Sequence, residues 1–289
     1  MTVHLGVVFP QTEIGADPLA IRDYTQAVED LGFDYLMAYD HVLGANPERP
    51  GGWRGPYTFR DTFHEPLTLY AWLAGLTRRL EFVTGILILP QRQTALVAKQ
   101  AAQVSLVSGG RLRLGVGIGW NAVEFAALGQ NFHRRGRRLE EQVILLRRLW
   151  TEPLVTHVGV EESIADAGLN PFPPKPIPIW FGGDADVALR RMAQLGDGWI
   201  PNWMPIDRLQ TTLATLRGYI AEEGRDPARF GIDVRIHVTR TPESDWRREA
   251  EQLAAMGVTH VCINTMSAGY TRLDQHLDTL RRFKAALSA

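Results

Sequence analysis

The sequence predicts an α/β fold, a (β/α)8 TIM barrel with insertion segments, and three observations predict it. Strand-like and helix-like segments alternate about eight times along the 289 residues, the pattern of a parallel sheet with helical cover. The strand-like segments are short, nearly continuous apolar runs, typical of strands buried on both faces. No shift in composition marks a boundary, so residues 1–289 are expected to form one domain. A doubly wound open sheet is the alternative.

The first half of the chain contains four predicted strands and four predicted helices. The strands are expected at 3–9, 35–38, 80–89 and 112–116, the third being interrupted by Gly85. The helices are expected at 18–31, 65–77, 94–107 and 134–150. Asp17-Pro18 and Glu65-Pro66 have the form of a helix start, with proline in the first helical position.

The second half continues the alternation. Strands are expected at 179–181, 197–200, 232–239 and 258–264. Helices are expected from Gly182-Gly183-Asp184 to about Leu195, and at 207–223, 244–256 and 271–286.

Two segments interrupt the repeat. Residues 44–65 form a long polar loop that contains Trp53, Tyr57, Phe59 and Phe63. Loops of this length in compact domains are often lids, so we expect either a cover over a ligand or a flap packed on the barrel rim. Residues 151–178 include five prolines at positions 171 to 178, which exclude a regular helix or central strand there and predict a strap.

Composition narrows the class of protein. The 31 basic and 32 acidic residues nearly cancel, which argues against a nucleic-acid partner. One cysteine, Cys262, excludes a disulfide framework and a multi-cysteine metal site, and its apolar surroundings predict a buried, inert thiol. Neither a signal peptide nor a membrane span is recognisable, so we expect a cytoplasmic protein without a membrane partner.

The stretch SGGRLRLGVGIGWNAVEF, residues 108–125, joins a strand to a helix through a glycine-rich turn. Alternating glycines at a strand end indicate close approach to the backbone or positive φ, and both a tight βα turn and a ligand account for them. Asn121 is an expected helix N-cap, and Glu124 is placed to accept an N–H of the first turn. The spacing is not the GxGxxG of dinucleotide sites.

In a TIM barrel the active site lies at the carboxyl ends of the strands. His41 is the only histidine that we assign to a predicted strand end there, where it serves either as a general acid or base or as a rim histidine bonded to a carbonyl. Gly182-Gly183 offers N–H groups to an anion, and Asp184 is either a ligand or a helix N-cap. The other histidines are scattered, so no metal site is predicted. Trp120, Trp199 and Trp203 are expected around the mouth, where they suit a flat cofactor or ordinary rim packing.

Four segments, in order along the chain, resemble the bacterial luciferase-like monooxygenase superfamily. They are the glycine-rich stretch at 107–120, EFAALGQNFHRRGRRLEE at 124–141, PIPIWFGG at 176–183 and LGDGWIP at 195–201. Within the superfamily the chain is most similar to probable coenzyme F420-dependent oxidoreductases. The resemblance implies a hydride transfer between F420 and an unknown small organic substrate. The alternatives are an FMN-dependent monooxygenase that uses reduced flavin and oxygen, and a flavin- or deazaflavin-binding protein without turnover.

The resemblance also implies roles for individual residues, and it implies that the protein forms a homodimer. It makes His41 the catalytic residue beside the reactive ring and places a bulge with a cis peptide at Gly85-Ile86. Trp120 stands where some sugar-phosphate-oxidising members have glutamate, which leaves the substrate open. The expected cofactor-binding residues are Asp40, Gly85, Ile86, Ile88, Gly119, Trp120, Asn121, Gly182, Gly183 and Asp184.

Overall fold

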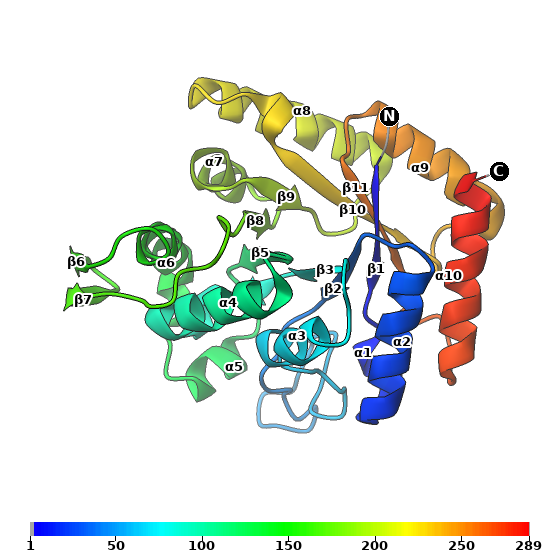
Figure 1. Ribbon diagram of the computed structural model, residues 1–289, viewed down its shortest axis with the longest axis horizontal. Coiled ribbons are helices and arrows are strands. Elements are labelled where there is room, and N and C mark those ends of the chain that lie inside the picture. Colours follow the sequence, from blue (N-terminus) through cyan, green and yellow to red (C-terminus); the bar gives the residue numbers. More distant parts are fainter. Residues whose placement is uncertain (1–2, 289) are drawn as a thin grey trace.

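Eight parallel strands close into a barrel in the computed structural model, which describes residues 3–288 (Figure 1). The sheet runs β3-β2-β1-β11-β10-β9-β8-β5, and an additional pairing between β3 and β5 closes it, which confirms the TIM barrel and excludes the open sheet. Every barrel pairing is parallel, as a chain that alternates strand and helix requires. The barrel strands are β1 (His4–Val8), β2 (Tyr35–Ala38), β3 (Glu81–Thr84), β5 (Leu112–Gly117), β8 (Ile179–Gly182), β9 (Gly198–Ile200), β10 (Gly231–His237) and β11 (His260–Asn264).

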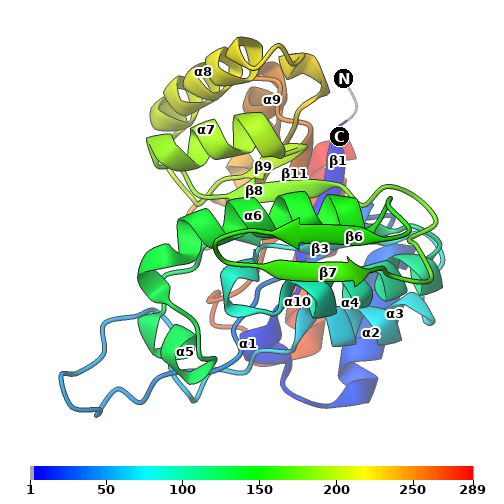
Figure 2. The same ribbon diagram turned by 90° about the vertical axis from the view of Figure 1, so that its left-hand side faces the viewer.

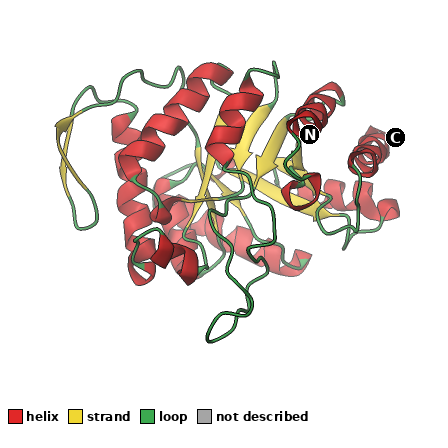
Figure 3. Cartoon of the chain, turned by 90° about the horizontal axis from the view of Figure 1, so that it is seen from below, coloured by secondary structure: helices red, strands yellow, loops and turns green. Residues whose placement is uncertain are grey.

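Helices surround the strands, so that the sheet is buried on its outer face (Figure 3). Two predicted starts are confirmed by their caps, because Asp17 accepts the N–H of Leu19 and Glu65 accepts that of Thr68. The helices are α1 (Gln11–Ile14), α2 (Pro18–Asp30), α3 (Pro66–Ala74), α4 (Thr94–Ser108), α5 (Ala122–Ala127), α6 (Arg135–Leu149), α7 (Asp186–Leu195), α8 (Ile206–Glu222), α9 (Trp246–Ala255) and α10 (Leu273–Ser288). Within residues 3–288, no helix has both the length and the apolarity to cross a membrane.

A charged network fills the amino-terminal end of the barrel. The buried guanidinium of Arg113 lies 3.2 Å from Asp233, and the hydroxyl of Tyr35 donates to the same carboxylate at 2.7 Å. The indole of Trp180 lies under the guanidinium, 4.2 Å from its carbon. Cys262 is buried in the same interior, as predicted, and burial raises the pKa of its thiol. Side chains thus occupy this end, and the open end is the one at which the strands finish.

The third barrel strand is broken by a bulge. Val83 on β3 pairs with Arg113, and Leu87 on β4 (Leu87–Ile88) pairs with Val116. Four steps along one strand therefore match three along the other, which is the extra residue of a β-bulge. The peptide bond between Gly85 and Ile86 in this bulge is cis. Bulges re-aim the chain beside active sites, and this one faces the open end of the barrel.

The two insertions differ in structure. Residues 151–178 contain an antiparallel hairpin, β6 (Val155–Val158) with β7 (Ser163–Ala167), that the sequence analysis does not predict, since β7 is mostly exposed and lacks apolar alternation. The proline-rich part after it has neither helix nor strand, as predicted. Residues 44–65 hold one isolated bridge, between Ala45 and Thr58, and Figure 2 shows this loop in blue, projecting beyond the barrel near α5.

Candidate functional site

A cavity of about 550 Å³ opens at the carboxyl ends of the barrel strands. Its volume lies within the range of roughly 300–1,000 Å³ that small-molecule and cofactor sites occupy. The structure brings most of the predicted site residues together here, although they come from four strand ends that are far apart in sequence. Those lining the cavity are Asp40, His41, Gly85, Ile86, Ile88, Gly119, Trp120, Gly182 and Gly183.

Two predicted cofactor ligands do not line this cavity. Asn121 is the N-cap of α5, where its side-chain oxygen accepts the N–H groups of Val123 and Glu124. Asp184 is turned toward Arg208, at 2.6 Å, and it is not the N-cap of α7 either, because that position belongs to Ala185. The carboxamide of Asn121 and the carboxylate of Asp184 are thus both bonded to other groups of the protein.

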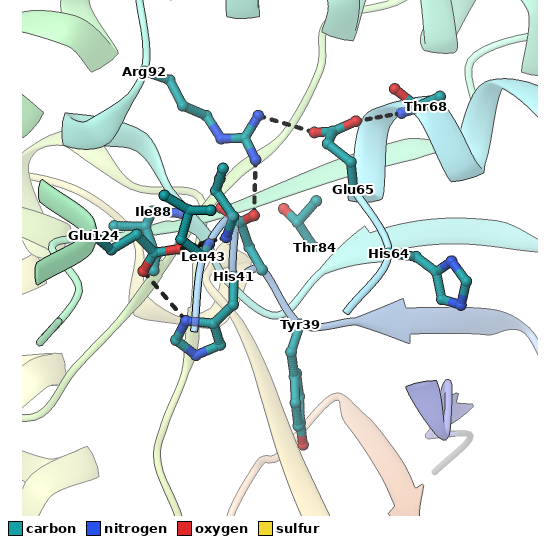
Figure 4. Close-up of polar contacts among 12 residues, drawn as sticks. Tyr39, His41, Leu43, His64, Glu65, Thr68, Thr84, Ile88, Arg92 and Glu124 are labelled. Atoms are coloured by element: carbon teal, nitrogen blue, oxygen red, sulfur yellow. Dashed lines mark hydrogen bonds and ion pairs between the residues drawn. The ribbon is translucent and has the colours of Figure 1, made fainter. Parts of the chain in front are cut away.

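His41 lies against a buried carboxylate that the sequence analysis assigns a different role. Its Nδ1 is 3.3 Å from Oε2 of Glu124, whose side chain is fully buried (Figure 4). The same carboxylate accepts the backbone N–H groups of Val42 and Leu43. The prediction that Glu124 accepts an N–H group in the first turn of α5 is therefore wrong. Its carboxylate instead holds the segment that carries His41 in place.

These contacts fix the protonation pattern at the site. Burial by itself would raise the pKa of Glu124, but hydrogen bonds from His41, Leu43 and Val42 outweigh it and hold that pKa below its ordinary value. Because an ionised carboxylate only accepts hydrogen bonds, Nδ1 of His41 carries the proton that faces it. Nε2 of His41 is then left for a ligand. This carboxylate–histidine pair is the arrangement that orients catalytic imidazoles.

Aromatic rings surround the imidazole of His41. The ring centroids of Tyr57, Phe63 and Trp120 lie 5.3, 4.8 and 5.5 Å from it. Trp120, which is 42% exposed, also packs against Trp53 of the loop. The loop 44–65 thus reaches over His41, as one of its two predicted placements requires.

Asp40 lines the cavity, but its carboxylate serves the framework. One oxygen accepts the N–H of Ile88 at 2.9 Å, and the other lies 2.7 Å from Arg92, which also binds Glu65 at 2.9 Å (Figure 4). Burial raises the pKa of Asp40, and the guanidinium of Arg92 offsets part of that rise. Asp40 thereby ties the end of β2 to the bulge and to the start of α3.

The predicted glycines give room to the bulge. A Cβ on Gly117 would lie 2.6 Å from Ile86, and one on Gly119 would lie 2.6 Å from Ile88. Gly119 also has a φ of +66°, so the turn needs glycine for both of the predicted reasons. Gly183 has a φ of +100°, and no side chain caps the helix α7 that follows it. Within residues 3–288, the N–H groups in the first turn of α7 therefore donate to no capping side chain.

The opposite wall contains a polar cluster that the sequence analysis misses. Asn264 accepts the N–H of Met266 through Oδ1, so its amide nitrogen donates to Tyr39 and to Nδ1 of His237. Burial, with Arg235 and the more distant Arg240, lowers the pKa of His237 to about 4, and burial raises that of Tyr39 to about 12.

His41 is thus not the only histidine at the active face, because His237 ends β10 and lines the same cavity. The end of β10 carries Arg235, His237 and Thr239 at alternating positions, and this period of two is the signal that would have found them. Trp199 is fully buried, and its indole N–H donates to the carbonyl of Gly183. The prediction that Trp199 lies at the mouth of the barrel is therefore wrong. Among residues 3–288, no three His, Cys, Asp or Glu side chains are grouped so as to hold a metal ion.

The family model for luciferase-like monooxygenases matches residues 2–285. The chain belongs to this family. An uncharacterized protein of Mycobacterium tuberculosis is 37% identical over 220 residues, which are 71% of this chain and 75% of that protein. The F420-dependent glucose-6-phosphate dehydrogenase of Segniliparus rotundus is 30% identical over 239 residues, which are 79% of this chain and 66% of that enzyme.

Two solved structures share the fold. An F420-dependent secondary alcohol dehydrogenase, in complex with an F420-acetone adduct, superposes with a TM-score of 0.82 at 16% identity and covers 99% of both chains. A monooxygenase from Streptomyces bottropensis has a TM-score of 0.76 at 17% identity over 98% of both chains. At these identities the likeness concerns the fold alone.

Proposed function

We propose that this chain is an oxidoreductase that transfers a hydride between coenzyme F420 and a small organic substrate. The observation that carries the proposal is the pairing of His41 with Glu124 in a cavity of cofactor size at the open end of a luciferase-like barrel. The named relatives support it, because they include F420-dependent dehydrogenases of glucose 6-phosphate. FMN in place of F420 is the alternative, since the family also includes monooxygenases.

The residues present fit a flat, phosphate-bearing cofactor. Gly117 and Gly182 leave room for the side chain of Ile86, and Gly119 leaves room for that of Ile88, so both isoleucines line the cavity where a ring can pack against them. The first turn of α7, next to Gly183, offers N–H groups to a phosphate. When bound, F420 supplies a deazaflavin ring carbon that accepts or gives a hydride.

The residues of this chain orient the reacting groups, exclude water and hold a proton. Glu124 keeps the proton of His41 on Nδ1, so that Nε2 is the atom that takes a proton from the substrate or returns one. The rings around His41 exclude water from that side of the imidazole. His237, held neutral by its low pKa, is unsuited to carry the proton at neutral pH and acts as a hydrogen-bonding group.

A fluorescence titration of the purified protein with F420 and, separately, with FMN tests the cofactor. Micromolar or tighter binding of F420 with none of FMN supports the proposal. The opposite preference favours the monooxygenase and leads to an oxygen-consumption assay. Binding of neither contradicts a flavin- or deazaflavin-dependent function.

Substitution of the histidine separates an enzyme from a carrier. His41→Ala is expected to lower turnover by roughly 10²–10⁴-fold while cofactor binding survives, because the imidazole moves a proton and does not hold the phosphate. A non-catalytic binding protein would lose nothing measurable in this variant.

A further inference from the structure

A second cavity, of about 240 Å³, adjoins the first between the loop 44–65 and the ends of β2 and β5. His41, Tyr57 and Trp120 line both cavities. A molecule in the second cavity would therefore lie beside the imidazole of His41, which the first cavity also reaches. This is the position that a substrate requires when a cofactor fills the larger space.

The walls of the second cavity are largely aromatic. Tyr57, Phe63 and Trp120 contribute rings close to the imidazole, and Phe59, which is 56% exposed, stands at the rim. Flat apolar molecules bury the most surface against such rings, and offset or edge contacts between rings add about 0.5–1.5 kcal/mol per pair. The flat rings on these walls favour a ligand with a flat face.

The electrostatics of the second cavity disfavour an anion. No lysine or arginine is among the lining residues that the structure describes, whereas Asp61 is one of them and the carboxylate of Glu124 lies directly behind His41. Arg60 stacks on Phe59 and does not line the cavity. Arg235 and Arg240 line the first cavity but not the second. A phosphate placed here would meet negative charge and no cation.

Two polar groups remain for an oxygen atom. The carboxylate of Asp61 is occupied by the N–H and hydroxyl of Thr58. In contrast, Nε2 of His41 and the hydroxyl of Tyr57 have no hydrogen-bond partner within residues 3–288, and both side chains line the first cavity as well as the second. A few polar groups that converge in a pocket are typical of small-molecule sites. Here they suit one hydroxyl or carbonyl oxygen.

We propose that the second cavity is the substrate site, and that it takes an uncharged, flat alcohol or ketone and excludes sugar phosphates. The assignment rests on the proposed hydride transfer. In the oxidative direction, the alcohol would lose its C–H hydride to F420 and its O–H proton to Nε2 of His41, and the ketone would remain. This separates the chain from its relatives that oxidise glucose 6-phosphate.

Two probes of similar shape and different charge test the assignment. Acetophenone and benzoate are titrated calorimetrically into the full-length protein, both without cofactor and loaded with F420 or FMN. We expect benzoate to bind at least about tenfold more weakly, because its charge would be buried without a partner. Phe59→Arg adds a cation at the exposed rim and should raise the affinity for benzoate alone, whereas the matched Phe59→Leu should not.

A turnover assay completes the test. We expect 1-phenylethanol to reduce F420 in the presence of the protein and glucose 6-phosphate not to do so. Equal or tighter binding of benzoate, no binding of either probe, or reduction of F420 by glucose 6-phosphate would overturn the assignment. If neither F420 nor FMN binds, the proposed function fails, while the comparison of the two probes in the cofactor-free protein still decides the chemistry of the cavity.

Discussion

Nδ1 of His41 lies 3.3 Å from Oε2 of Glu124, although 83 residues separate them in sequence. The two residues follow different barrel strands, β2 and β5, whose carboxyl ends share one face of the barrel. A fully buried carboxylate with several donors is well suited to hold an imidazole in one tautomer. Closure of the barrel thus brings the pair together.

Replacing the carboxylate should slow turnover without loss of the fold. Glu124→Gln keeps the size of the side chain and an oxygen for the N–H of Leu43, but it removes the negative charge. We expect turnover to fall about tenfold to a hundredfold, less than the roughly 10²–10⁴-fold loss for His41→Ala.

The control for this change is Glu48→Gln, at an exposed position of the loop. It should leave both the rate and the pH profile unchanged. A Glu124→Gln protein that turns over as fast as the unchanged protein would show that Glu124 only supports the backbone of Val42 and Leu43.

Alanine substitutions at two glycines with similar φ distinguish the cost of backbone strain from the cost of crowding beside the cavity. Gly119 and Gly129 have φ of +66° and +68°, so alanine costs about 1–2 kcal/mol of folding stability at either position. At Gly119 the added Cβ would also press on Ile88, whereas nothing lies within 4 Å at Gly129.

Urea unfolding and cofactor titration measure the difference. Gly119→Ala should lose roughly 1–3 kcal/mol more than Gly129→Ala and should bind the cofactor more weakly, because Ile88 lines the cavity. Equal effects of the two changes on both measurements would be inconsistent with a tight turn beside the cofactor.

Removing the guanidinium from the framework should destabilise the fold in a pH-dependent way. Arg92→Met leaves the buried Asp40 without its cation, and such a change costs about 3–5 kcal/mol. Burial already raises the pKa of Asp40, so in this variant the neutral carboxyl is favoured and stability is lost as pH rises through the folded-state value.

Thermal unfolding between pH 5 and 8 checks this. The deficit of Arg92→Met relative to the unchanged protein should grow toward pH 8, and adding Asp40→Asn should remove that growth. A deficit that is constant with pH would assign the effect of Arg92 to packing.

A buried histidine should make the fold sensitive to acid. His276 is only 2% exposed, and burial lowers its pKa from 6.5 to about 4. The unfolded chain binds a proton below about pH 6.5, whereas the folded chain does so only near pH 4, so stability falls as pH drops through this window. For His276, the loss from pH 7 to 5.5 amounts to no more than about 1 kcal/mol.

His276→Gln should flatten the pH dependence by that amount in chemical unfolding. The substitution retains a polar side chain for the hydroxyl of Thr265, which lies 2.8 Å from Nδ1. An unchanged slope of stability against pH would mean that His276 titrates alike in the folded and unfolded chain.

The barrel was predictable from the sequence because its signals are local. The predicted strands are short apolar runs, and some helices carry their own start signal, as Asp17 and Glu65 illustrate with capping bonds at the predicted positions. The order of such elements then determines the topology, since parallel strands need helical crossovers.

The partners of the site residues were less predictable. Glu124 occupies a helix start where a local hydrogen bond explains an acidic residue equally well, and only closure of the barrel turns it toward His41. The cluster around Asn264 joins three strands through side chains, and no spacing within a single strand encodes that contact. The hairpin β6–β7 is exposed and held at one end by Glu141 of α6, so its strands lack the burial pattern that prediction needs.

Anaerobic absorbance of the F420-loaded protein is the most direct measurement of the central claim. Oxidised F420 is mixed with uncharged aromatic alcohols, and reduced F420 with the matching ketones, beside a parallel oxygen-uptake assay with reduced FMN. Hydride transfer between F420 and these substrates predicts that the F420 absorbance changes in one direction and that no oxygen is taken up. It also predicts that the change in F420 absorbance is lost in His41→Ala. Unchanged F420 together with oxygen uptake from reduced FMN would contradict it.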